Sequence, residues 1–381
     1  MNNKLNSLAL SITLGLSANT QVQAAPLVSL EAIGTHTTGI FDEGAAEIVA
    51  HDARNQRIFK INADAAAVEV LDINDPEISM LIGTIDASEL GGGANSVAIY
   101  KDLVAVAIEA EVAQDPGLVA FYDSTDLSII GTVYVGALPD MVTFTPNGRY
   151  VLVANEGEPD DDYKVDPEGS ISIIDLRHGV GSASVRTADF NAWDGNEDEL
   201  RAEGVRIFGP GASTSQDLEP EYITVANNSR TAWVAMQEAN ALAVVDIKSA
   251  TVTDILPLGT KDHSLPGNEL DASNRDGAIN ITNWPVKGFY MPDAITSYKF
   301  DGMTYIVSAN EGDSRDYEGF SEEERIKDLV LDPVAFPDAA TLQEDENLGR
   351  LNSTTVNGDI DGDGDFDELY SYGARSFSIW S

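Results

Sequence analysis

The sequence contains no cysteine, which excludes disulfides, cysteine nucleophiles and thiolate metal ligands. Histidine is scarce as well, and the four histidines show no spacing typical of a zinc site, such as His-Glu-x-x-His. Stability must therefore come from a hydrophobic core, which a chain of 381 residues with 43% apolar side chains can supply, and bound metal ions could add to it.

Basic residues are also few. Lys and Arg number 22 against 64 Asp and Glu, which leaves a formal net charge of −42. A surface this negative repels the nucleic-acid backbone and anionic membranes, so we expect neither as a partner. Divalent cations are the expected counterpart.

The only segment that looks like a targeting signal stands at the N-terminus. Lys4 precedes an apolar stretch at residues 8–16, and Val22 and Ala24 supply a small-residue cleavage pattern. Serine and threonine interrupt the stretch, which makes it too short for a membrane anchor, and no spanning run occurs elsewhere. We predict a signal peptide at residues 1–24, a mature domain at residues 25–381, and a periplasmic or extracellular location.

A short repeat recurs along the chain, in which an apolar strand ends in an acidic or amide residue. The four copies occupy residues 106–111, 153–158, 234–239 and 308–313. Three of them follow a proline and an acid, at residues 139–140, 220–221 and 292–293. The spacing between the two pieces is nearly constant, as expected for strands joined in a hairpin.

Units of roughly 40 to 50 residues with several short strands are typical of propeller blades. We therefore predict an all-β fold, a β-propeller of four-stranded blades; a β-sandwich with accidental similarity is the alternative. The predicted blades span residues 47–90, 91–135, 136–210, 217–258 and 288–381. Because closure removes the last sheet edge, we expect an incomplete ring whose missing C-terminal segment adds blades. A complete five-bladed ring is the alternative.

Two helical insertions are expected within the repeats, at about residues 187–216 and 313–371. The first should contain a short helix near residues 197–203. In the second, Ser321 and the following glutamates form a capping-box pattern that predicts a helix start, and another helix is expected after Pro337.

The sharpest motif is the acidic stretch at residues 359–368, which reads Asp-Ile-Asp-Gly-Asp-Gly-Asp-Phe-Asp-Glu. Its oxygen donors at alternate positions and its glycine at the sixth match the first half of an EF-hand loop, although Tyr370 stands at the twelfth. Carboxylates this dense repel one another without a cation, so we predict a Ca²⁺ site; a solvated acidic turn is the alternative. The expected ligands are Asp359, Asp361, Asp363, Asp365, Asp367 and Glu368.

A second candidate site consists of the acids of the repeat. Equivalent positions on successive blades lie around one axis, so these side chains should meet at one opening. Such a ring can bind a cation or act in acid–base catalysis; the alternative is that each carboxylate caps backbone amides of a neighbouring blade. The set comprises Glu109, Glu156 and Glu311, with Gln237 at the equivalent place, and the proline-linked acids Asp140, Glu221 and Asp293.

Two further features carry weaker expectations. Ser314, in a Gly-Asp-Ser sequence, lacks an Asp-x-x-His partner, so we do not expect it to be a nucleophile. Several arginines lie in or near the insertions and could bind phosphate, but pairing with carboxylates is the favoured interpretation. They are Arg201, Arg206, Arg315, Arg325, Arg350 and Arg375.

Longer motifs resemble the secreted propeller family called choice-of-anchor I. They are found at residues 200–211, 216–222, 309–313, 344–351 and 375–380, and the resemblance extends from about residue 28 to the end. Its relatives include mesenchyme-specific cell surface glycoproteins and bacterial atypical alkaline phosphatases. The resemblance implies a calcium-rich extracellular propeller, similar to lactonase-like propellers, without an established catalytic set.

These observations favour an exported, calcium-binding β-propeller that acts as a binding or surface-associated module, with a phosphorylated or surface ligand as a further partner. The alternative is a metal-dependent phosphomonoesterase, in which ions held by Glu109, Glu156 and Glu311 polarise a phosphate and activate water. A third hypothesis, that the acidity is an adaptation to salt, predicts stability that depends on ionic strength and not on calcium.

Overall fold

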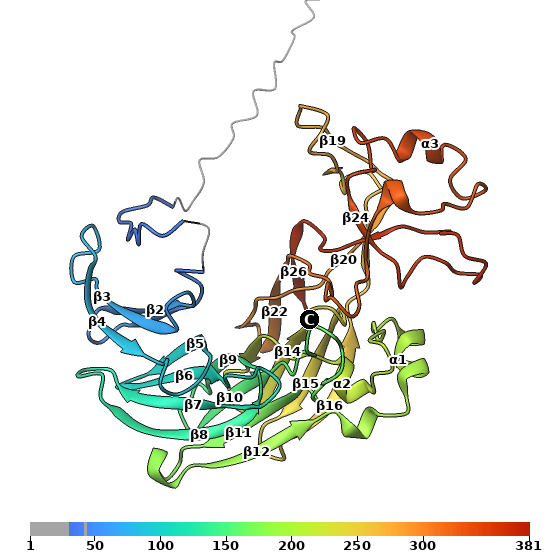
Figure 1. Cartoon of the computed structure of the whole chain (residues 1–381). Helices are drawn as coiled ribbons and strands as arrows, with labels where there is room; N and C mark the ends of the chain where they lie inside the picture. Colours follow the sequence, from blue (N-terminus) through green and yellow to red (C-terminus); the bar gives the residue numbers. More distant parts are fainter. Residues whose placement is uncertain (1–29, 42–43) are drawn as a thin grey trace, which may run out of the picture.

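The computed structural model describes residues 30–41 and 44–381, and these form mainly β-structure (Figure 1), which confirms the predicted all-β fold. The predicted signal peptide at residues 1–24 lies outside the described residues. Within the part of the chain that the structure describes, no helix is both long and apolar enough to cross a membrane.

Four antiparallel sheets of four strands follow one another along the chain, each with its strands in sequence order. The first contains β1 (Val49–Asp52), β2 (Arg57–Asn62), β3 (Ala67–Asp72) and β4 (Met80–Asp86). The second contains β5 (Gly93–Tyr100), β6 (Leu103–Glu109), β7 (Pro116–Asp123) and β8 (Ile129–Ala137). The third contains β9 (Pro139–Phe144), β10 (Tyr150–Asn155), β11 (Ser170–Asp175) and β12 (Ser184–Asp189). The fourth contains β13 (Ile223–Val225), β14 (Thr231–Met236), β15 (Ala241–Asp246) and β16 (Thr251–Pro257).

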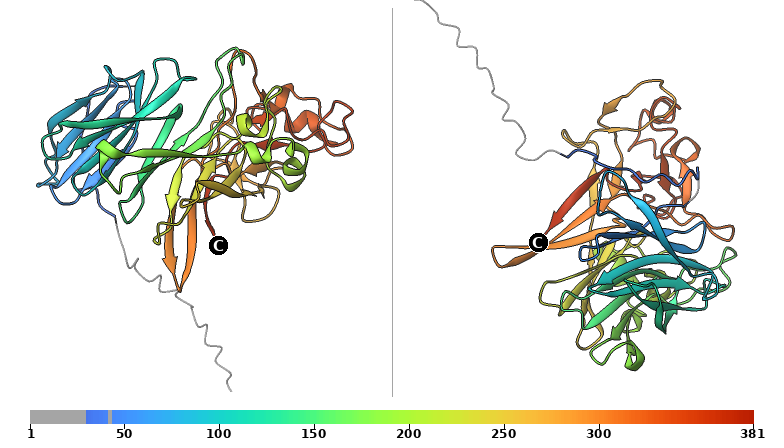
Figure 2. Two further views of the ribbon diagram at one scale, coloured as in Figure 1. Left: turned by 90° about the horizontal axis from the view of Figure 1, so that it is seen from below. Right: turned by 90° about the vertical axis from the view of Figure 1, so that its left-hand side faces the viewer.

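A fifth sheet has three strands, β21 (Ile295–Phe300), β22 (Met303–Asn310) and β26 (Ser376–Trp380). The first strands of successive sheets contact each other, β1 with β5, β5 with β9, β9 with β13 and β13 with β21. The sheets therefore radiate from a line of inner strands, as propeller blades do. Figure 1 and the left view of Figure 2 show that they form an arc from the N-terminal to the C-terminal end.

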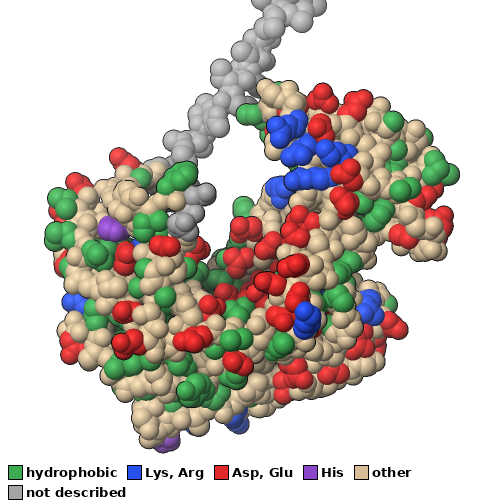
Figure 3. Space-filling model, in the orientation of Figure 1, with side chains coloured by type: hydrophobic (Ala, Val, Ile, Leu, Met, Phe, Trp, Pro, Cys, Tyr) green, Lys and Arg blue, Asp and Glu red, His purple; other side chains and the backbone are tan. Residues whose placement is uncertain are grey.

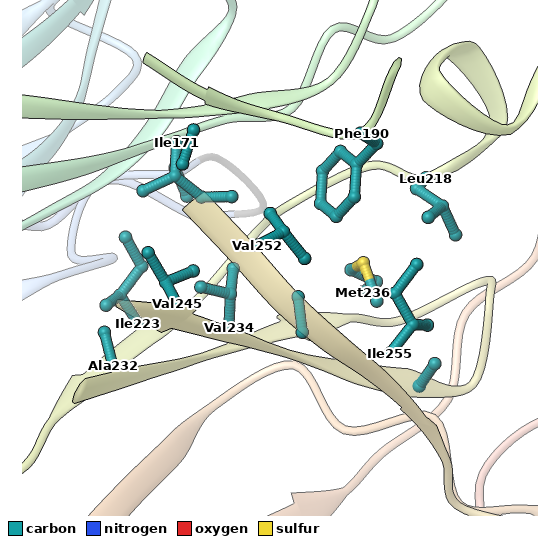
Figure 4. Close-up of a cluster of buried hydrophobic side chains, with 14 of the residues drawn as sticks. Ile171, Phe190, Leu218, Ile223, Ala232, Val234, Met236, Val245, Val252 and Ile255 are labelled. Carbon is teal, nitrogen blue, oxygen red and sulfur yellow. The ribbon is translucent and has the colours of Figure 1, made fainter. Parts of the chain in front are cut away.

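The hydrophobic cores lie between consecutive sheets, because both faces of each blade must be covered. Between the third and fourth sheets, Ile171 of β11 and Val234 and Met236 of β14 are fully buried beside Phe190 and Leu218 (Figure 4). Burying each side chain of this size stabilises the fold by about 1.5–3 kcal/mol. Similar clusters join the first sheet to the second and the second to the third.

The first insertion follows β12, which takes up residues 187–189 of the predicted segment. The expected helix is confirmed as α1 (Glu197–Glu203), whose first turn carries acidic residues that suit the positive end of the helix dipole. Short helical turns flank it, η2 (Asn191–Trp193) before it and α2 (Thr214–Asp217) after it, while η1 (Val180–Ser182) lies between β11 and β12.

The second insertion and the segment before β21 form a separate body of short elements, which we call the C-terminal lobe (residues 260–289 and 313–371; Figure 1). Its strands are β17 (Thr260–Asp262), β18 (Leu270–Asp271), β19 (Ile281–Thr282), β20 (Lys287–Phe289), β23 (Glu323–Arg325), β24 (Asn352–Thr354) and β25 (Tyr370–Ser371). Its helices are η3 (Ile326–Asp328) and α3 (Ala339–Leu342), which confirms the helix expected after Pro337.

The helix predicted to start at Ser321 is wrong. The residues after Ser321 form β23, which pairs with β24, and not a first helical turn. Glu322 is fully buried in an ion pair with Arg206, and its backbone donates to the carbonyl of Arg315. The capping pattern is overridden because this buried ion pair holds the segment in an extended conformation.

Candidate metal centre

The inner strands bring acidic residues from different blades to the same end of the propeller. The second strand of each blade runs antiparallel to the first, so the residue after the second lies beside the start of the first. In the third blade this places Glu156, after β10, near Asp140 in β9, and the charges of these two carboxylates repel each other. In the fifth blade it places Glu311, after β22, near Asp293, before β21. The two pieces of the sequence repeat therefore meet.

The asparagine and glycine of the repeat have structural roles that aim these acids. The side chain of Asn155 donates to Ser172 (2.9 Å), and the equivalent Asn310 donates to Ser378 (2.8 Å). The glycine after each glutamate has a left-handed backbone, with φ of 74° and 86° respectively. Only glycine adopts this conformation at little cost, so the chain turns sharply just after the acid.

The residues that precede the proline-linked acids are strained. Leu138 and Met291 have φ of 43° and 42°, in the left-handed region that residues with bulky side chains rarely occupy. Their carbonyls accept hydrogen bonds from the repeat, at Glu156 N (2.9 Å) and Gly312 N (3.0 Å). Strain of this kind persists only where the surrounding structure imposes it, and it is common at functional sites.

The acids gathered at this end of the inner strands form what we call the axial cluster. Its members are Asp140, Glu156, Glu158, Glu221, Glu238 and Asp293. Beside it, a cavity of about 280 Å³ is lined by residues that include Glu47, Asn95 and Tyr222. Figure 3 shows acidic side chains along the floor of the concave region between the N-terminal sheets and the C-terminal lobe, which we call the hollow.

Burial and mutual repulsion raise the pKa values of several carboxyls of the axial cluster. Burial first, and then the charges of Asp293 and Glu158, raise the pKa of Asp140 to about 7. The pKa values of Glu156 and Glu221 are raised well above the usual range, again by burial first and then by neighbouring carboxylates. A divalent cation among these oxygens would favour their ionised forms and remove the repulsion.

Two buried oxygen atoms of the axial cluster have no hydrogen-bond partner among the described residues. They are Oε2 of Glu221, whose residue is 6% exposed, and Oε2 of Glu238, whose residue is 9% exposed. The other oxygen of Glu221 accepts only a long bond from the backbone of Gln237 (3.3 Å). Leaving a buried acceptor unpaired costs about 1–3 kcal/mol, and more for a charged group. Glu221 and Glu238 lie close enough to share a hydrogen bond when one of them is protonated, so these atoms are satisfied either by a shared proton or by a bound cation.

Arg315 brings a positive charge to the edge of the cluster, but other acids already engage it. Its guanidinium pairs with Asp217, and Nη2 lies 2.7 Å from Oε2 of Glu219, with all three side chains almost fully buried. Tyr317 donates to Oε1 of Glu158 (2.9 Å), yet burial still raises the pKa of Glu158. These contacts fix the edge of the axial cluster without balancing its charge.

The remaining predicted residues lie at the periphery of the cluster. Glu109 ends β6, where Oε2 accepts a hydrogen bond from Asn95 (3.3 Å) and the charge helps to raise the pKa of Asp140. Glu311 is exposed. Gln237 is buried and donates to the carbonyl of Met291 (3.1 Å).

Sequence reasoning missed Glu158 and Glu238, although a signal was present. Each lies within two residues of a repeat position, in Glu-Gly-Glu at residues 156–158 and in Gln-Glu at residues 237–238. Where the repeat position carries an amide, the next residue therefore supplies the carboxylate. Ser314, which we did not expect to be a nucleophile, donates to Glu323 (2.7 Å).

The acidic loop offers two groups of carboxylates whose oxygens come close enough to share a metal ion. One consists of Asp359, Asp361 and Asp367, and the other of Asp365, Asp367 and Asp332, which the sequence pattern missed. Glycines at 362 and 364, with φ of 79° and 99°, let the loop turn.

The other two predicted ligands of the loop make different contacts. Asp363 accepts a bond from the backbone of Asp365 (3.2 Å). Glu368 pairs with Lys287 at 2.6 Å and accepts from the hydroxyl of Tyr370, outside both groups.

The radial sheets and the carboxylates at their inner ends define the class of the protein, an acidic β-propeller. The chain belongs to the choice-of-anchor I domain family, which matches residues 47–381. None of the curated proteins matches this chain.

Several solved structures are similar to this chain at low identity. The nidogen/laminin complex has 13% identity and a TM-score of 0.36, covering 57% of this chain and 65% of that one. Hydrazine synthase from Kuenenia stuttgartiensis has 12% identity and a TM-score of 0.35, covering 63% and 83%. A functionally unknown protein from Desulfotomaculum acetoxidans has 10% identity and a TM-score of 0.40, covering 69% and 62%. This chain thus spans less than two thirds of the first and third of these chains.

Proposed function

We propose that the protein is an exported, calcium-binding β-propeller that acts as a binding or surface-associated module, with Ca²⁺ held in the axial cluster. The observation that carries the proposal is the pair of unpartnered buried oxygens, Oε2 of Glu221 and Oε2 of Glu238. Hard cations such as Ca²⁺ take six to eight oxygen ligands, and carboxylates from several blades can supply them. An ion at this place would bridge blades that are distant in the sequence.

A calcium titration of the full chain tests the proposal, followed by thermal melting and calorimetry. A ligand that binds only the folded state stabilises it by RT ln(1 + [L]/Kd), so the melting temperature should rise with calcium and not with sodium chloride of matched ionic strength. Stabilisation by either salt alike would support the salt-adaptation hypothesis instead.

The variants Glu221→Gln and Glu238→Gln separate a metal site from a structural carboxylate. Each variant replaces a carboxyl that repels its neighbours when ionised by a neutral amide, so the calcium-free variant should melt at a higher temperature than the parent, while its calcium response falls. Glu203→Gln, on the exposed face of α1, is the matched control and should change neither property. A calcium response that survives in both cluster variants would contradict the axial site.

One observation favours the second candidate, a metal-dependent phosphomonoesterase. A carboxyl whose pKa is raised to about 7, as in Asp140, can both donate and accept a proton near neutral pH. Hydrolysis of p-nitrophenyl phosphate that requires calcium, and that is lost in Glu156→Gln and Glu311→Gln, would support the enzyme over the binding module. The control Glu203→Gln should keep any such activity.

A further inference from the structure

A cavity in the C-terminal lobe has the opposite charge to the axial cluster. Its volume is about 470 Å³, and Arg325, Arg350 and Arg375 line it, with Asp271 as the one acid among its lining residues. These side chains leave two net positive charges in a chain whose net charge is −42. Figure 3 shows Lys and Arg side chains gathered on the side of the lobe that faces the hollow.

The three guanidinium groups have no carboxylate partner. Within residues 30–41 and 44–381, none of them forms an ion pair. Arg325 donates to the carbonyl of Arg350, Arg350 Nε to Asn274 Oδ1 (3.4 Å), and Arg375 Nη1 to the carbonyl of Tyr372 (3.1 Å). A guanidinium has five N–H donors, so these contacts orient each group and leave donors for a ligand.

The other arginines of the insertions behave as the sequence analysis favoured. Arg201 pairs with Asp198, Arg206 with Glu322, and Arg315 with two acids. In a chain this rich in acids, the three arginines of this cavity form no ion pair among the described residues, although Asp271 also lines it, whereas Arg201, Arg206 and Arg315 elsewhere are paired. The charge of the cavity is therefore available to an anion from outside.

The position of the cavity connects it to the acidic side of the hollow. Gly312 lines it, and the neighbours of this glycine are the acidic Glu311 and Asp313. Arg375 has a left-handed backbone, with φ of 48°, immediately before β26. This conformation is uncommon for a residue with a side chain, and it places the arginine at the edge of the cavity.

We propose that this cavity binds the phosphoryl group of a phosphomonoester. Guanidinium groups recognise phosphate oxygens through paired, charge-assisted hydrogen bonds, and two net positive charges suit a dianion better than a monoanion. The volume lies within the range of small-molecule sites and leaves room for the organic part of an ester beside Leu351. The inference goes beyond the cation-binding function and does not depend on it.

Titration calorimetry of the full chain in a buffer free of divalent cations tests the proposal, with phenyl phosphate as the probe and benzoate as the monoanion. Phenyl phosphate should bind the parent protein, and benzoate should bind at least about tenfold more weakly. Arg325→Gln and Arg350→Gln should each raise the Kd for phenyl phosphate by about tenfold or more, because a charge-assisted bond pair is lost.

Arg230→Gln, in the exposed turn after β13, removes the same charge elsewhere and should change the Kd less than about twofold. Arg375→Gln tests the same cavity with little risk of misfolding, because this exposed side chain has only a carbonyl contact to lose. It should also weaken the binding of phenyl phosphate. The proposal is overturned by absence of binding to the parent, by benzoate binding as tightly, or by equal weakening in Arg230→Gln.

Discussion

The axial cluster and the acidic loop are both dense in carboxylates, yet their surroundings differ. The loop is local: its six acids lie within residues 359–368, three of them are exposed and none is fully buried, and backbone amides donate to them, as Gly362 N does to Asp359 (2.7 Å). The acids of the axial cluster come from three blades and are largely buried, and two of their oxygens lack a partner.

This difference teaches where a cation affects stability most. In the loop, water screens the repulsion between Asp361 and Asp363, although this repulsion still raises the pKa of Asp361. In the axial cluster the repulsion between carboxylates is screened less, because they are more buried. A cation that removes this repulsion would strengthen the contacts between blades. A cation held by the loop would change the stability of the fold little, whereas an axial ion would stabilise the propeller itself.

The largest expected effect comes from removing the positive charge beside the axial cluster. Arg315→Met leaves Asp217 and Glu219 buried without a positively charged partner, which should lower the free energy of unfolding by about 3–5 kcal/mol. Urea denaturation measures the loss. Arg201→Met, which removes an exposed pair with Asp198, is the control and should cost far less. Equal losses would show that the buried network contributes no special stability.

A smaller effect is expected from pH in the absence of metal. The pKa of Asp140 rises from 3.8 to about 7 on folding, so between these values the folded state binds more protons than the unfolded state. The stability that this group contributes is fully present below about 3.8 and is lost as the pH rises through about 7.

Thermal melts between pH 5 and pH 8 measure this dependence. In chelator the melting temperature should fall with rising pH, and saturating calcium should reduce the fall. Asp140→Asn should make this fall smaller without abolishing it, because the pKa values of Glu156 and Glu221 are also raised, whereas the exposed Asp254→Asn should leave it unchanged. A calcium-free melting temperature that rises over this range would contradict the assignment of Asp140.

The smallest effect is expected from the acidic loop. Asp361→Asn combined with Asp365→Asn removes one ligand from each carboxylate group, so calorimetry should find fewer calcium ions bound. The calcium-induced rise in melting temperature should stay close to that of the parent. Asp328→Asn, an exposed acid of η3, serves as the control. Loss of the whole rise would show that the stabilising ion is bound by the loop and not by the axial cluster.

Repetition made most of the fold predictable. Each four-stranded blade is formed by strands and turns that are neighbours in the sequence, and the recurrent Ala-Asn-Glu pattern predicted that equivalent strand ends lie together. Local reasoning failed at Ser321, where a buried ion pair between Glu322 and the distant Arg206 overrides a helix start. It also missed Asp332, which reaches the acidic loop from a segment almost thirty residues earlier.

The sequence by itself determined the blades, the acidic character and the repeat positions, because these depend on strand periodicity, composition and spacing within about fifty residues. Only the tertiary structure decided which carboxylates are buried without a partner and which arginines are left unpaired. Burial and the distance between charges from different blades are properties of packing, and packing controls both the desolvation and the repulsion of these groups. Glu238 and Arg350 are ordinary charged residues in the sequence. In the folded chain one has a buried oxygen without a hydrogen-bond partner among the described residues, and the other lines a cavity with two further arginines.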